Sequence, residues 1–131
     1  MVGAAILSML LAASEPGWNC AEPRFQQEMN WCAAQDFHKA DAALNVQWKV
    51  TSAQMKRRDA DQGKPDDGRP GNYAALLAAQ RAWLRFRDAH CDLEGYQFRG
   101  GSMEPLLVAT CRTALTEART KQLRELVDVE G

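Results

Sequence analysis

The sequence has no apolar run long enough to span a membrane, no internal repeat and no excess of charge of either sign. Lys and Arg number 16 and Asp and Glu number 17, so the formal net charge is −1. Proteins that bind DNA, RNA or anionic membranes carry a basic excess, which is absent here. We therefore expect neither a nucleic-acid partner nor a transmembrane segment.

Catalytic motifs are missing as well. The chain has no nucleophile elbow, no His-Glu-x-x-His metal motif and no free Cys–His pair. The combination that most resembles a zinc site is His38 and His90 with Cys32 and Cys91. Cys32 and His38 are six residues apart and share no helix face, and disulfides compete for the thiols. We predict no enzyme activity, no cofactor and no metal site.

Residues 4–13 form a short apolar leader that ends in small residues, as in the apolar region of a signal peptide. This stretch is too short to cross a bilayer. Residues 1–3 lack the usual basic residue, so the leader is weak or truncated. We expect cleavage after Ala13, which makes residues 1–13 a signal peptide and 14–131 a single domain. The alternative is a disordered apolar N-terminus on a cytosolic protein.

Four cysteines follow this leader: Cys20, Cys32, Cys91 and Cys111. An even cysteine count in a small exported chain predicts two disulfides and an oxidising compartment. We expect a periplasmic or secreted protein without a free thiol. The pairing Cys20–Cys32 with Cys91–Cys111 closes two short loops and is favoured. The pairing Cys32–Cys91 with Cys20–Cys111 stays open, since these positions meet in an antiparallel hairpin.

Apolar residues recur every three or four positions in three long stretches, and no stretch alternates as a strand does. We predict helices over about 27–60, from 72 or 73 to about 91, and from a Ser102 cap to about 127, with Asn72 capping the second. The fold class is all-α, an antiparallel three-helix hairpin or bundle held by two disulfides. Residues 61–72, rich in Gly and Pro, form a flexible insertion between the first two helices.

Polar residues fall on helix faces that should be buried. They are Gln80 and Arg87 in the second helix and Arg119 in the third. Asp41 and Asn45 share a face of the first helix, and an unpaired buried arginine is costly, so we expect Asp41 to pair with Arg81 or Arg87. This cluster is either a structural ion-pair network or a polar binding site.

The loop over residues 92–102 ends in Gly100, Gly101 and Ser102, at the predicted start of the third helix. Free backbone N–H groups at a helix start favour anions, but Glu104 just inside disfavours them. The alternatives are a tight loop with a helix cap or a protruding contact surface. Tyr96, Phe98 and Arg99 are the side chains that such a surface would present.

Several phrases occur along the chain in an order that resembles the LprI-like lysozyme-inhibitor family. They are Gln27-Glu28-Met29-Asn30-Trp31-Cys32, Ala40-Asp41-Ala42-Ala43-Leu44-Asn45, Ala79-Gln80-Arg81-Ala82-Trp83-Leu84-Arg85-Phe86-Arg87-Asp88-Ala89-His90-Cys91, Gly100-Gly101-Ser102, and Cys111 with Leu115-Thr116 and Arg119. The resemblance implies a small exported bacterial helical protein. The chain departs from the family's lipoprotein namesake in having no lipidation motif before Cys20, and in carrying the 61–72 insertion.

The resemblance implies a non-enzymatic binding module that inhibits lysozyme, with a protein partner. Glycosidase clefts work with two carboxylates, which Arg99 would approach while Tyr96 and Phe98 fill sugar subsites. Exposed Trp18 or Trp31 would be further interface candidates. The alternative is a structural or stress-related envelope protein that binds another protein without inhibiting an enzyme.

Overall fold

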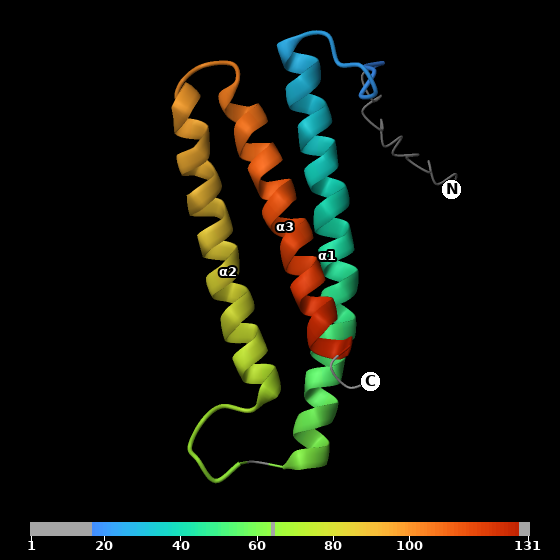
Figure 1. The fold of residues 1–131 in the computed structure, drawn as a ribbon, viewed down its shortest axis with the longest axis vertical. Coiled ribbons are helices and arrows are strands. Elements are labelled where there is room, and N and C mark those ends of the chain that lie inside the picture. The colour runs from blue at the N-terminus through green and yellow to red at the C-terminus, as the bar shows by residue number, and fades with distance from the viewer. Residues whose placement is uncertain (1–16, 64, 129–131) are drawn as a thin grey trace, which may run out of the picture.

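The chain folds into three long helices, seen in a computed structural model that describes residues 17–63 and 65–128 (Figure 1). They are α1 (Gln26–Gln62), α2 (Asn72–Gly95) and α3 (Glu104–Asp128), and a short 3₁₀ helix, η1 (Tyr96–Phe98), follows α2 directly. No strand occurs among these residues. The all-α bundle predicted from sequence is confirmed. The predicted signal peptide and its cleavage site lie outside the described residues.

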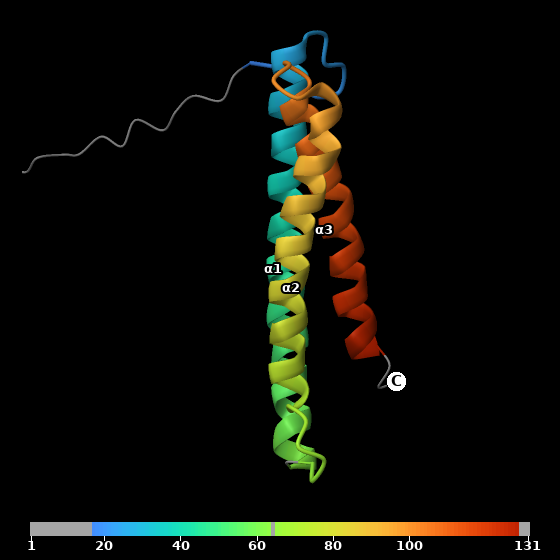
Figure 2. The same ribbon diagram turned by 90° about the vertical axis from the view of Figure 1, so that its left-hand side faces the viewer.

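The helices run in alternating directions, so α1 and α3 point the same way and α2 runs against both (Figures 1 and 2). The most extensive contacts join α1 to α3, and α1 touches α2 least. α1 has 37 residues and α3 has 25. The ends of α1 and α2 that flank the linker extend past the C-terminal end of α3 (Figures 1 and 2). None of the three helices is both long and apolar enough to cross a bilayer.

Apolar packing is concentrated in the half of the bundle nearest the α1–α2 linker. The buried cluster consists of Leu44, Met55, Leu76 and Leu123, with Trp48, Tyr73 and Trp83 packed against it. Leu123 is completely buried, and the carbonyl oxygen of its peptide accepts a 2.8 Å hydrogen bond from the Thr51 hydroxyl.

The start of α2 is capped by a side chain from α1, which differs from the sequence-based prediction. Asn72 is the first residue of α2, and Gly71 precedes it without a side-chain cap. The Asp59 carboxylate accepts hydrogen bonds from the backbone N–H groups of Asn72 (2.7 Å) and Tyr73 (3.0 Å). These bonds lower the pKa of Asp59 below its usual value. The linker is therefore fixed at its α2 end.

Both disulfides have the local pairing favoured from sequence. Cys20 bonds Cys32, and Cys91 bonds Cys111. Each bond belongs to the half of the bundle opposite the linker: one ties the N-terminal segment to α1, and the other ties α2 to α3. No free cysteine occurs in the described part of the chain.

Candidate functional site

The turn between α2 and α3 is shorter and more regular than the sequence suggested. α2 continues to Gly95 and η1 follows, so residues 92–98 of the predicted loop are helical. The turn closes at Gly100, whose φ of +79° favours glycine, and the Gly101 N–H donates a 2.8 Å hydrogen bond to the Phe98 carbonyl. α3 begins at Glu104, two residues after the predicted Ser102 cap. We call residues 96–102 the tip.

The tip exposes two aromatic residues and one arginine. Tyr96 and Phe98 are 48% and 43% exposed, so they do not close over the core. The Arg99 guanidinium lies 4.5 Å from the centre of the Tyr96 ring, within range of a cation–π contact. Tyr96 and Arg99 therefore form one small surface of aromatic and cationic character, and Phe98 is exposed in the same turn.

The tip is held to α1 as well as to its own helices. The Asn30 amide donates a 2.9 Å hydrogen bond to the Ser102 carbonyl, across 72 residues of sequence. Gly95 lets α2 approach α3 closely, because a Cβ at this position would lie 2.6 Å from a methyl carbon of Val108. The Glu104 carboxylate lies 3.5 Å from the Gly100 nitrogen and is the acceptor for its N–H. A negative side chain thus occupies the place where a bound anion would sit.

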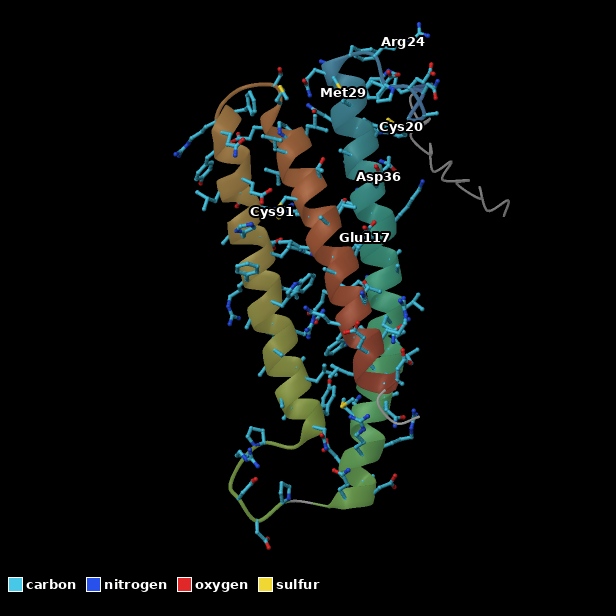
Figure 3. All side chains as sticks on the ribbon, viewed as in Figure 1. Cys20, Arg24, Met29, Asp36, Cys91 and Glu117 are labelled. Atoms are coloured by element: carbon cyan, nitrogen blue, oxygen red, sulfur yellow. A yellow bond between two sulfur atoms is a disulfide. The ribbon has the colours of Figure 1, made fainter. Side chains whose placement is uncertain are left out.

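A second aromatic cluster lies at the same end of the bundle. The Trp18 ring packs edge-on against Phe25 and Trp31, with ring centres 5.6 Å and 5.9 Å away. Phe25 is 46% exposed. Figure 3 shows the labelled Cys20 and Arg24 beside the first turn of α1, the region from which this cluster comes. We call Trp18, Phe25 and Trp31 the N-terminal aromatic cluster.

Glu28 organises this N-terminal segment and was not identified from sequence. Its buried carboxylate accepts hydrogen bonds from the backbone N–H groups of Asn19 (3.0 Å) and Arg24 (2.6 Å). Glu28 is the third residue of α1, the position from which a glutamate commonly bonds backbone N–H groups before the helix. A glutamate at the third position of a predicted helix is the sequence signal that could have identified this role.

A surface hollow of about 640 Å³ lies beside the tip, between the upper parts of the three helices. Its lining includes Phe37 and His38 from α1, Tyr96 from the tip and Arg112 from α3. Arg112 pairs with Asp88 and Asp92 at 3.6 Å each. The charge of Arg112, the arginine that lines the hollow, is therefore already balanced by two aspartates.

Arg87 is the buried arginine of the predicted polar cluster. It donates hydrogen bonds to the Thr116 hydroxyl (3.3 Å) and to Asp88 (3.0 Å). Its guanidinium lies 5.2 Å from the ring centres of both Phe37 and Trp83. Its nitrogen is 4.0 Å from Asp41, whose side chain is 42% exposed. The Asp41 contact is therefore longer than the two hydrogen bonds of Arg87 and involves a side chain that is well exposed.

The other residues of the predicted polar cluster do not join Arg87 and Asp41 in one network. Arg119 donates a 2.8 Å hydrogen bond to the buried Gln80, and burial lowers the pKa of Arg119. Arg81 and Asn45 are exposed. Arg87 is thus the arginine beside Asp41, and Arg81, the other candidate, lies on the surface because it is six residues from Arg87 and faces another side of α2.

The residues considered for zinc do not form a site. Cys32 and Cys91 are consumed in disulfides. Potential ligand atoms of His90, Glu94 and Cys111 lie within 4.8 Å of one another. The Cys111 sulfur is bonded to Cys91, however, and the His90 ring nitrogen lies 3.1 Å from Glu94.

Comparisons with known proteins identify related sequences. A family model described as "Lysozyme inhibitor LprI" matches residues 20–123. A protein of Rhizobium meliloti (strain 1021), called "Uncharacterized protein R02472", is 41% identical over 128 residues, covering 93% of this chain and 92% of the relative. No solved structure gives a significant match.

Proposed function

Because the chain belongs to the LprI lysozyme-inhibitor family, we propose that it is an exported, non-enzymatic inhibitor that blocks a lysozyme cleft with its tip. The family and the two disulfides suggest a protein outside the cytoplasm. Within that setting the proposal places it in the periplasm or outside the cell. Its partner is a glycosidase, and its mechanism is steric and electrostatic occlusion.

The observation that carries the proposal is that the tip exposes its side chains while its backbone is restrained. Exposed aromatic and arginine side chains are the residue types that dominate binding energy at interfaces. The bond between Cys91 and Cys111 and the Asn30–Ser102 hydrogen bond restrain the backbone beneath Tyr96, Phe98 and Arg99. A restrained surface loses less conformational freedom when it binds, so a small surface can bind well.

The chemistry of the tip matches a glycosidase cleft. Such a cleft holds two catalytic carboxylates between sugar-binding subsites. Arg99 supplies a cation with several N–H donors, and Tyr96 and Phe98 supply flat faces of the kind that sugar subsites accommodate. The N-terminal aromatic cluster lies at the same end of the bundle and extends the surface that would contact the rim.

The test is a cell-wall clearing assay in which each lysozyme class is titrated with the pure protein. We expect Arg99→Glu to weaken inhibition at least tenfold, or about 1.4 kcal/mol, with an unchanged melting temperature. Arg124→Glu is the matched control, since Arg124 is an exposed arginine near the far end of α3.

Two outcomes would count against the proposal. Equal inhibition by the Arg99→Glu and Arg124→Glu variants would remove the tip from the mechanism. No inhibition of any lysozyme class by the intact protein would favour the alternative, an envelope protein that binds a different partner.

A further inference from the structure

α2 lies at one edge of the bundle (Figure 1), and it carries an exposed apolar face. Its large members are Phe86 and Leu93, which are 56% and 62% exposed. They are seven residues apart, so they lie on the same side of the helix. Ala79, Ala82 and Ala89 are exposed positions of that side. Another side of α2 buries Leu76, Gln80, Arg87 and Cys91, so the apolar face has no partner within the described residues.

Phe86 is held in place before any partner binds. The His90 ring stacks on it with ring centres 5.3 Å apart and planes 15° from parallel. His90 is itself fixed by its 3.1 Å contact with Glu94, one turn further along the helix. An aromatic side chain that is already ordered loses little entropy on association.

One flank of this face changes the sign of its charge along the helix. Arg81 and Arg85 occupy the first part, and both are exposed. Asp88 and Asp92 occupy the second part. Their side chains are 49% and 53% exposed, and each also lies 3.6 Å from Arg112 of the same chain. The spacing of four, three and four residues keeps all four on the same flank. When two such helices lie antiparallel across a two-fold axis, equivalent flanks face each other, so the basic part meets the acidic part.

We propose that two copies of the protein associate through this face, with α2 of one copy antiparallel to α2 of the other. A register that sets residue 86 opposite residue 87 of the second copy places Arg81 opposite Asp92 and Arg85 opposite Asp88. Leu93 then falls between Ala79 and Ala82 of the second copy, where small side chains leave room for a large one.

The charge pattern gives no support to a parallel arrangement. In a parallel pair this flank would face the other flank of the second helix, so Arg81 and Arg85 would not meet Asp92 and Asp88. A single pair of helices buries less than the roughly 800 Å² per partner of a standard interface. We therefore expect a weak and reversible dimer. Added salt dissociates it further, because exposed charge pairs are screened.

Sedimentation velocity over a range of protein concentrations tests the proposal. The intact chain should shift from monomer to dimer as concentration rises. Arg81→Glu and Asp92→Arg should each weaken the dimer at least tenfold, or about 1.4 kcal/mol. A 1:1 mixture of these two variants should recover the dimer, because Glu at 81 then faces Arg at 92, and Asp92 faces Arg81.

Recovery in the mixture distinguishes a charge pair from a folding defect, because mixing would not restore association to a misfolded variant. Asp92→Arg also removes a contact with Arg112, so circular dichroism must show that it folds. Leu93→Lys provides a test that does not depend on Asp92: it changes an exposed residue and should leave a folded monomer. A chain that stays monomeric at every concentration, or a Leu93→Lys variant that dimerises normally, would overturn the proposal.

Discussion

The two halves of this bundle are stabilised by different means. The half near the linker holds the apolar cluster around Leu44 and Leu123. The half near the tip holds both disulfides, the buried arginine Arg87 and the buried carboxylate Glu28. Polar contacts between exposed groups contribute little to stability, and buried charges carry a desolvation cost. Covalent bonds therefore compensate where the apolar core is thin.

The difference between the two halves also bears on where a binding surface can form. A fully apolar end would have to bury its aromatic side chains to remain stable. The tip end is held by disulfides and by hydrogen bonds such as Asn30 to Ser102. It can therefore leave Tyr96 and Phe98 about half exposed without losing its shape. The proposed inhibitory surface thus lies on the half whose stability does not depend on covering every apolar group.

The largest effect should come from the apolar half. Leu123→Ala removes a completely buried side chain and should lower the free energy of unfolding by roughly 2–5 kcal/mol. Leu126→Ala is the control, because Leu126 is 40% exposed in the same helix and should cost about 0.5 kcal/mol or less. Denaturant unfolding measures both. Equal losses would mean that the apolar cluster does not support this half.

The next effect concerns the disulfide half. Replacing Cys91 and Cys111 together by alanine should cost about 3 kcal/mol, the loop-closure entropy for a separation of 20 residues. Replacing Cys20 and Cys32 releases only the N-terminal segment and is the control. Hydrogen exchange of the first pair's variant should lose protection near the tip and keep it around Leu44. Uniform loss along α1 would show that the halves unfold together.

Most of the fold could be predicted from the sequence because it depends on local periodicity and on loop length. The helix faces follow from the spacing of apolar residues, the position of the linker from its Gly and Pro residues, and the favoured local disulfide pairing from the spacing of cysteines. The extension of α2 from about Cys91 to Gly95 was missed, because residues 92–102 were predicted to form a loop. Here Gly95 is needed for the close approach to Val108, a contact between distant parts of the chain that sequence spacing does not reveal.

The candidate site was predictable as a set of residue types but not as a geometry. Tyr96, Phe98 and Arg99 were the side chains that a protruding contact surface would present, and the structure shows them exposed; their role in binding stays a prediction. The choice between Arg81 and Arg87 as the partner of Asp41 could not be made, because both lie on α2 and their depth depends on how α3 packs. The Asn30–Ser102 bond joins residues 72 apart, a separation at which sequence carries no signal.

A smaller loss of stability is expected at Arg87, and it should exceed the loss at its neighbour Asp41. Arg87→Ala removes two ring contacts and a buried hydrogen bond, and it should cost about 2 kcal/mol. Asp41→Ala should cost under about 1 kcal/mol, because its side chain is 42% exposed and lies 4.0 Å away. Thermal melts of both variants and of the double variant give the coupling. A strong coupling would show that this ion pair, and not the disulfides alone, stabilises the tip half.

The smallest effect belongs to the cap at the linker end. Asp59→Ala removes the acceptor for the Asn72 and Tyr73 N–H groups, and we expect a modest fall in melting temperature at pH 7. Folding lowers the pKa of Asp59 below 3.8. The cap therefore stabilises the protein fully above the unfolded pKa, and its contribution is lost as the pH falls through the lower folded pKa.

The difference in melting temperature between the intact chain and Asp59→Ala should accordingly shrink as the pH falls below about 4. The Asp61→Ala variant is the control, since Asp61 is exposed two residues along the same helix. Hydrogen exchange should locate the loss in the first turn of α2 and leave the tip unaffected, because the linker end has no disulfide through which a local change would spread. A difference that persists at low pH would mean that the Asp59 carboxylate is not what holds the start of α2.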